Sequence, residues 1–555
     1  MRSLFNGLKY GLVSAGLVLA SSVHLQAQDV LITNANGYHI ADGKLVRFDT
    51  LLIRSGRVAA AGPASALEQW GEGIRNHDVD GATLLPGLID AHGHVFGLGH
   101  QLLNVNLVNS KSLADAQARV AAGLPTAGAW VRGGGWNQVI WGLGRFPTAQ
   151  ELDTVTGDKP AYLRRVDGHA AWVNSKALKM AGITKDTPDP QGGLIVRDAD
   201  GNATGVLVDA AMDLVEGIIP EPSDAQRRKA LDEALASMAS LGMTGVHDAG
   251  ITPEQWAIYR SYAGQKKLTS RIYAMIGGAG EVFDALAQNG PQMGLGEDRL
   301  YLRSVKLYSD GALGSRGAAL HWPYSDDPDN HGLLFVDDIT MINQISRVVS
   351  RGFQANVHAI GDKANTQVLD AFETVLRHNG SGLRHRIEHA QVMRLEDIPR
   401  MKRLGLIASM QPTHATSDKN MAEDRLGHIR IKGAYAWRTI LEEGIVIASG
   451  SDFPVEPPNP FYGLHAAVTR RDRNGDPLEG WYANQKMTVE EALKSFTSDA
   501  AYAAHMEDKV GSLETGKWGD FILIDQDIFE IDPQDIWKTK VLETWLAGER
   551  VYAAQ

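Results

Sequence analysis

Short apolar runs recur through the middle of the chain, and they alternate with longer segments of helical periodicity. Between these runs, residues 338–351, 362–378 and 433–443 have the apolar spacing of amphipathic helices. Strands that alternate with helices run parallel, so the pattern predicts an α/β fold, a (β/α)8 TIM-like barrel. The eight expected strands end near His94, Asp248, Ile276, Tyr308, His358, His389, Gln411 and Asp452.

The two ends of the chain have a different pattern, in which short β-type runs are separated by turns. Residues 28–82 and 503–555 both read this way. Neither segment is large enough to form a stable sheet pair alone. We therefore expect them to pair into one small β-sandwich domain, with the barrel at residues 83–502.

A large insertion, about residues 100–240, separates the first expected strand from the second. This stretch is far longer than an ordinary barrel connection, and it is rich in tryptophan and glycine. Because it follows the first strand, it is well placed to cover a site at the barrel end, with Trp136 as a candidate substrate contact. The alternative is a packing unit whose tryptophans form its own core.

The N-terminus predicts a targeting segment. Arg2 and Lys9 precede or flank an apolar stretch at residues 11–20, and residues 25–27 form an acceptable cleavage site. We expect residues 1–27 to be a signal peptide, although an uncleaved anchor remains an alternative. With no cysteine for disulfides or lipid attachment, the chain is expected to be periplasmic or secreted, without stable membrane insertion after cleavage.

The charge balance limits the partners. The formal net charge is −12, and no basic cluster interrupts the acidic chain. A nucleic-acid partner is therefore not expected. A small-molecule substrate is expected, and a homo-oligomer is left open.

Candidate metal ligands stand where several of the expected strands end. His92 and His94 are one residue apart on a strand, so their imidazoles face the same side and can close on one cation. The alternative for this pair is two solvent-exposed loop histidines. Further candidates follow other apolar runs, and strand C-termini carry the chemistry of such barrels. They are Lys306, His358, His389 and Asp452.

Five ordered motifs carry a resemblance to a known family. They are Leu85–His94, Val305–Arg316, His358–Asp362, Arg386–His389 and Gly450–Val455. Together they resemble the amidohydrolase superfamily of metal-dependent hydrolases. More narrowly, the chain is similar to amidohydrolase family 3, which includes YtcJ-like proteins and N-substituted formamide deformylases.

The resemblance implies a two-metal site. His92 and His94 would hold the first ion, His358 and His389 the second, and a carboxylated Lys306 would bridge two zinc ions. Asp452 would bind the first ion and accept the proton of the bridging water. Two alternatives stay open. Lys306 could instead pair with Asp310 or contact the substrate, and Asp452 could be a ligand only.

Attack of metal-activated hydroxide on a carbonyl suits an amide, an ester or a cyclic amide. The resemblance favours a carbon–nitrogen bond other than a peptide bond. A deaminase or imidazolonase-like enzyme and a non-catalytic periplasmic binding protein are the alternatives, because a fold does not determine a substrate. Besides Trp136, the candidate substrate contacts are His169, His247, Arg316 and His414, each of which could equally be structural.

Overall fold

The computed structural model describes residues 29–67, 70, 73–124, 128–165, 170–190, 193–377 and 382–555. The expected signal peptide at residues 1–27 and the candidate substrate contact His169 lie outside the described residues. Among the described ranges, no helix combines the length and the apolar character needed to cross a membrane.

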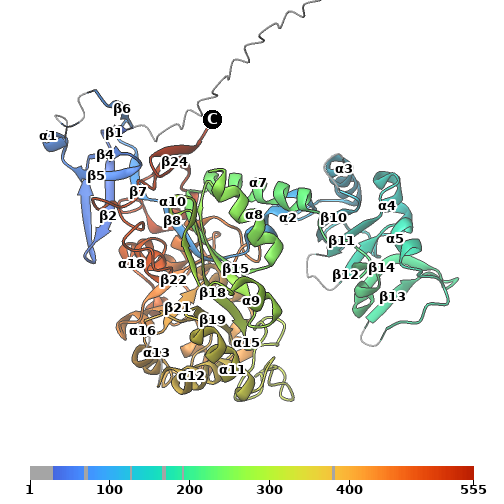
Figure 1. Cartoon of the computed structure of the whole chain (residues 1–555). Coiled ribbons are helices and arrows are strands. Elements are labelled where there is room, and N and C mark those ends of the chain that lie inside the picture. Colours follow the sequence, from blue (N-terminus) through green and yellow to red (C-terminus); the bar gives the residue numbers. More distant parts are fainter. Residues whose placement is uncertain are drawn as a thin grey trace, which may run out of the picture.

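The centre of the molecule is a nearly closed barrel of eight parallel strands, as the alternating pattern predicts (Figure 1). The seam between the last and first strands is joined by the amide of Asp452, which donates to the carbonyl of His92 over 2.7 Å. The strands are β8 (Leu88–Gly93), β15 (Met243–Ile251), β16 (Arg271–Gly277), β18 (Leu300–Tyr308), β19 (Gln354–Ala359), β20 (Arg386–His389), β21 (Ile407–Met410) and β22 (Ile447–Ser449).

Helices surround the barrel (Figure 1). On α11, Met341, Ile345 and Val348 are buried at helical spacing, so one apolar stripe packs inward. The third expected helix, at residues 433–443, is shorter because Tyr435 has a positive φ of 51° and the helix begins only after it. The helices are α2 (Val95–Leu103), α7 (Asp224–Ser240), α8 (Pro253–Gly264), α9 (Glu281–Leu286), α11 (Asp338–Ser350), α12 (Asp362–Leu376), α13 (Ile398–Leu404), α14 (Pro412–Asp418), α15 (Ala422–Arg430), α16 (Trp437–Glu442), α17 (Pro460–Thr469), α18 (Val489–Ser495) and α19 (Ser498–Ala503).

Strands from both ends of the chain form a separate β domain (Figure 1). Strand β7 lies between β2 from the N-terminal region and β23 from the C-terminal region, and the two sheets share a core that includes Leu51, Phe521 and Trp545. Its strands are β1 (Val30–Thr33), β2 (Asn36–Ala41), β3 (Lys44–Phe48), β4 (Thr50–Arg54), β5 (Arg57–Gly62), β6 (Arg75–Asp78), β7 (Thr83–Pro86), β23 (Phe521–Ile524), β24 (Val541–Leu546) and β25 (Glu549–Ala553).

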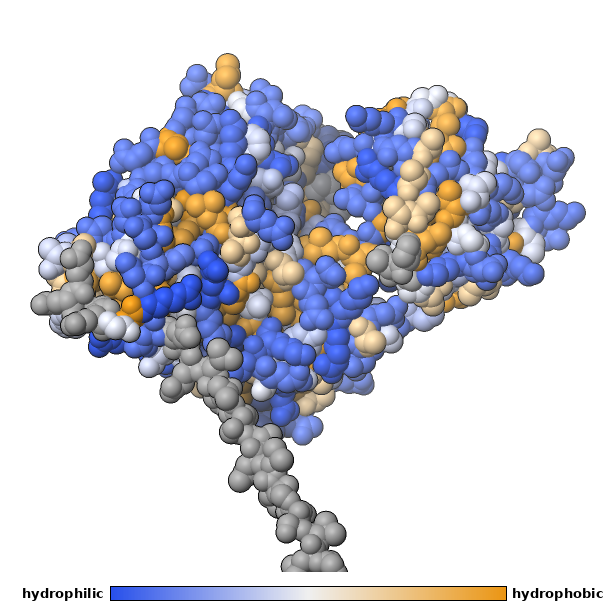
Figure 2. Space-filling view, turned by 90° about the horizontal axis from the view of Figure 1, so that it is seen from above, coloured by the Kyte–Doolittle hydropathy of each residue, from blue (hydrophilic) through white to orange (hydrophobic). Residues whose placement is uncertain are grey.

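The insertion folds around a sheet of its own and stands as a lobe beside the barrel (Figures 1 and 2). A cavity of about 600 Å³ lies where the lobe meets α7 and α8, lined by Arg132, Arg227 and Gln255 among others. The elements of the lobe are β9 (Val105–Asn106), α3 (Leu113–Gly123), β10 (Val131–Trp136), α4 (Ala149–Thr156), β11 (Ala161–Arg165), β12 (Ala170–Val173), α5 (Ser175–Met180), β13 (Gly193–Arg197) and β14 (Ala203–Asp209).

Trp136 belongs to the core of this lobe. Its side chain is fully buried, its ring packs near Trp141 and Trp172, and its indole N–H donates to the carbonyl of Leu163 over 2.7 Å. The indole has no surface left for a substrate. Trp136 is therefore a core residue and not the substrate contact expected from the sequence, because it packs with Trp141 and Trp172 in one apolar cluster of the lobe.

Candidate metal centre

The carboxyl ends of the barrel strands bring several of the sequence-predicted ligands together. His92 Nε2 lies 3.1 Å from Lys306 Nζ and 3.6 Å from Asp452 Oδ1. His94, which follows β8, also reaches Asp452 Oδ1, with its Nε2 at 3.1 Å. Residues from the first, fourth and last strands of the barrel thus converge on one point.

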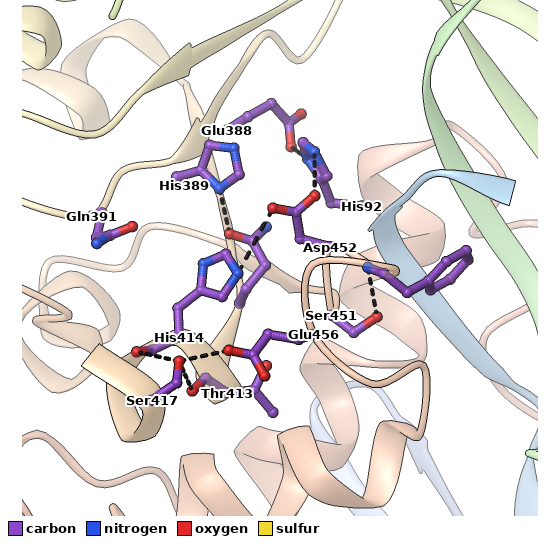
Figure 3. Close-up of polar contacts among 12 residues, drawn as sticks. His92, Glu388, His389, Gln391, Thr413, His414, Ser417, Ser451, Asp452 and Glu456 are labelled. Carbon is purple, nitrogen blue, oxygen red and sulfur yellow. Dashed lines mark hydrogen bonds and ion pairs between the residues drawn. The ribbon is translucent and has the colours of Figure 1, made fainter. Parts of the chain in front are cut away.

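His358 and His389 extend the same cluster. The ring centroid of His389 lies 4.9 Å from that of His92 and 4.6 Å from that of His358. His92, His389 and Asp452 each offer a ligand atom within 4.8 Å of the others (Figure 3). His358 Nε2 is buried 3.5 Å from Asp310 Oδ1 and makes no hydrogen bond among the described residues. Such a set of buried nitrogen and oxygen donors fits a divalent metal ion.

The protonation states also suit metal binding. Burial lowers the pKa of His92 and of His389 far below the usual value, and it lowers the pKa of His358 to about 4. Burial alone would raise the pKa of Asp452, but the hydrogen bond from His94 and the neighbouring histidines hold that pKa well below its usual range. Neutral imidazoles and an ionised carboxylate are the forms that bind metals.

Two polar residues orient the imidazoles. His92 Nδ1 donates to Glu388 Oε2 over 2.5 Å, with both side chains fully buried. His389 Nδ1 donates to Gln411 Oε1 over 2.7 Å. Both contacts leave Nε2 directed toward the cluster, the arrangement by which outer partners set the tautomer of a metal-binding histidine.

Sequence reasoning missed Glu388, although it stands directly before His389. Successive residues of a strand point to opposite faces, so a ligand at His389 would place Glu388 outside the barrel. The backbone of His389 instead has a positive φ of 75°, which ends the extended geometry. Both side chains can therefore face the barrel interior, and this turn carries no clear sequence signal.

Lys306 is buried beside the cluster. Burial lowers the pKa of its ammonium group, against the opposing effect of Glu388 and Asp452. The structure shows no Lys306–Asp310 ion pair between these two described side chains. Asp310 instead accepts backbone amides from Ala319, Ile360 and Gly361, which fixes the loop after β18.

Of the other candidate contacts, His414 lies nearest to the cluster. It stands on α14, its Nε2 is 3.7 Å from Asp452 Oδ2, and its ring is nearly parallel to that of His389 at a centroid distance of 6.0 Å (Figure 3). His414 Nε2 is buried and has no hydrogen-bond partner in the described part of the chain.

His247 and Arg316 have structural partners. His247 Nδ1 accepts from the buried guanidinium of Arg386 over 2.9 Å. Arg316 lies in the loop after β18, where its guanidinium pairs with Asp326 at 3.0 Å. These contacts give both side chains a structural role that needs no substrate.

The fold and the donor set define a metal-dependent hydrolase barrel, and comparison with known proteins agrees. Residues 77–552 match the model of a family described as the amidohydrolase family. The match spans most of the chain, so this protein belongs to the amidohydrolase family.

Individual relatives cover nearly the whole chain. Protein LONG AFTER FAR-RED 3 of Arabidopsis thaliana is 34% identical, with 94% of this chain and 91% of the relative covered. An N-substituted formamide deformylase of Arthrobacter pascens is 27% identical, covering 94% and 98%. Among solved structures, an uncharacterized metal-dependent hydrolase of Pyrococcus horikoshii has a TM-score of 0.78 at 28% identity, covering 91% of this chain and 99% of that one.

Proposed function

We propose that this protein hydrolyses a carbon–nitrogen bond, other than a peptide bond, in a small amide. The observation that carries the proposal is the convergence of neutral imidazoles with the ionised Asp452 at the carboxyl end of the barrel. This donor set suits metal-assisted hydrolysis. The similarity to an N-substituted formamide deformylase favours an amide over an ester.

We further propose that the site holds two divalent ions, with zinc as the expected metal. His92 and His94 would hold one ion and His358 and His389 the other. Lys306 would bridge them as a carbamate, formed when its neutral amine attacks carbon dioxide and loses a proton. The burial of Lys306 and its position 3.1 Å from His92 Nε2 support this assignment.

A bound divalent ion lowers the pKa of a water ligand, so that hydroxide exists near neutral pH, and it polarises a carbonyl group. In the proposed reaction Asp452 accepts the proton of the attacking water and returns it to the departing nitrogen. Its carboxylate is only 10% exposed, so bulk water has little access to the transferred proton. His414, beside Asp452 Oδ2, would donate a hydrogen bond to the substrate or to the developing oxyanion.

The test is amine release by metal-loaded protein from N-formyl, N-acetyl and longer N-acyl amides, with Asp452→Asn as the comparison. We expect the variant to keep much of its metal, while turnover falls by a factor of about 10² to 10⁴, the usual contribution of a general base. Near-normal turnover by Asp452→Asn would reassign the proton transfer. If the native protein releases no amine from any amide of the panel, this result would contradict amide hydrolysis and favour cyclic amides, esters or deamination.

We also propose export to the periplasm or the medium, on the basis of the N-terminal sequence pattern. N-terminal sequencing of protein from the periplasmic fraction is expected to begin at Gln28. Recovery of the full-length chain from the cytoplasm would contradict this proposal.

A further inference from the structure

The loop after β22 places a second carboxylate close to Asp452. The amide of Val455 donates to the carbonyl of Asp452 over 2.9 Å, which closes a turn, and Glu456 follows directly. Glu456 Oε1 accepts a hydrogen bond from Ser417 Oγ over 2.5 Å (Figure 3). Glu456 is thereby fixed at the mouth of the barrel, on the side where α14 carries His414.

Ser417 lies between this carboxylate and the backbone of His414. The Ser417 hydroxyl also lies 3.2 Å from the carbonyl oxygen of His414, whose ring nitrogen is 3.7 Å from Asp452 Oδ2. Figure 3 shows Glu456, Ser417 and His414 next to one another, on the side of His414 away from Glu388. A substrate bound at the metal centre and extending toward α14 would meet Glu456.

Glu456 differs from the neighbouring Asp472 in its charge environment. Asp472 pairs with Lys419 at 3.0 Å. No ion pair involving Glu456 occurs among the described residues, and its only side-chain partner there is the neutral Ser417. A partly exposed carboxylate that is oriented but not neutralised can accept a cation from a ligand.

We propose that Glu456 is the binding subsite for a positively charged ammonium group of the substrate. The substrate class would be an amide whose leaving amine carries a second, cationic nitrogen. Val455, the preceding residue in the chain, has an exposed apolar side chain. This inference rests on the proposed amide hydrolysis, which sets the orientation of the bound substrate between the metal centre and Glu456. The affinity of Glu456 for a cation can be measured separately.

The turnover test compares two N-formyl amides whose leaving amines end in a trimethylammonium group or in its uncharged isostere, a tert-butyl group. The trimethylammonium group cannot lose a proton or bind a metal, so only its charge distinguishes the two substrates. Glu456→Gln is expected to lower kcat/KM for the cationic substrate about tenfold, mainly through KM, because the ion contact between the carboxylate and the trimethylammonium group is lost. The ratio between the two substrates is the readout, and an unchanged ratio overturns the proposal.

Ser417→Ala is the matched control, since it removes the hydrogen bond to Glu456 but keeps the carboxylate. We expect this variant to retain the preference for the cationic substrate. If Glu456 serves only to tie the loop to α14, both variants will lower turnover of the two substrates equally. That result would overturn the subsite.

A binding measurement makes the proposal independent of turnover. Titration calorimetry of metal-loaded protein with choline and with its uncharged isostere 3,3-dimethylbutan-1-ol is expected to show preferential binding of choline, reduced about tenfold in Glu456→Gln. Equal affinity of the native protein for the two compounds overturns the proposal. A Glu456-dependent choline preference without turnover of any amide would instead retain the subsite and refute the proposed hydrolysis.

Discussion

Replacing Glu388 by glutamine tests whether the contact behind His92 controls metal binding. The substitution preserves the shape of the side chain but removes its charge. His92 Nδ1 then loses a charged acceptor at 2.5 Å in a region where both side chains are fully buried. The glutamine amide can also present an N–H to the imidazole, which would favour the wrong tautomer and direct a protonated Nε2 toward the cluster.

The expected magnitude follows from the burial of this contact. A hydrogen bond to a charged group contributes about 1.5 to 3 kcal/mol, and each 1.4 kcal/mol corresponds to about tenfold in an equilibrium constant. We therefore expect metal affinity to fall about 10- to 100-fold, the usual effect of losing an outer partner of a ligand. Because Arg386 lies 4.0 Å from Glu388 Oε1, the variant should also unfold more easily, since the buried guanidinium loses a nearby anion.

The assay is competition for zinc between the protein and a chelator of known affinity, with folding checked by circular dichroism. Glu507→Gln is the matched control, because Glu507 pairs with Arg384 at 2.5 Å near the start of the same strand, away from the metal centre. We expect the control to bind zinc normally. A folded Glu388→Gln variant with native zinc affinity would refute the orienting role of Glu388.

Three further predictions concern the bridge, the lobe and the response to acid. Lys306→Ala should lose metal and activity, and short carboxylic acids should partly restore both; unchanged metal content by elemental analysis would exclude the bridge. Trp136→Ala should destabilise the lobe by about 3 to 5 kcal/mol, as for removal of a large core side chain, without changing the metal content. Proteolysis within residues 105–209 should then be faster than in the native protein. Native resistance of this variant to the protease would contradict the core role of Trp136. Burial lowers the pKa of His385 to about 4. As pH falls from about 6.5 to about 4, His385 is protonated in the unfolded chain before it is protonated in the folded protein. The free energy of unfolding therefore decreases over this pH range. Urea unfolding should therefore show that His385→Asn loses less stability than the native protein between pH 7 and pH 5, with the difference approaching about 2 kcal/mol; parallel losses would refute this assignment.

Much of the fold was predictable because the barrel repeats one simple pattern. Each apolar run is short enough for a strand, and each is followed by a helix whose apolar stripe faces it, as on α11. Pairing between strands from the two ends of the chain was also expected, since neither end could complete a sheet alone. Residues 83–86 were expected to belong to the barrel, but they form β7, which pairs with β2 and β23 in the β domain. The arrangement of the lobe was not predictable, because its position depends on contacts between surfaces and not on periodicity.

The candidate site likewise contains residues that could be predicted from the sequence and residues that could not. The proximity of His92 to Lys306 and Asp452 was predictable from the sequence, because parallel strands place their carboxyl ends at one side of a barrel. Glu388 and Gln411 were not found, since their roles depend on side-chain contacts between different strands and on the positive φ of His389. Strand-end position identifies candidate ligands, whereas orientation of their rings requires three-dimensional contacts.

Closure of the barrel and assembly of the metal centre involve the same residues. Asp90 accepts hydrogen bonds from the amide of His92 and from both the amide and the hydroxyl of Ser451, so it connects the first strand to the end of the last. Asp452, directly after Ser451, donates its amide to the carbonyl of His92. The positive φ of 59° at Asp452 then turns its side chain back toward the imidazoles. A metal ion that binds His92 and Asp452 together would hold this seam closed, so metal binding and barrel stability are expected to be thermodynamically linked.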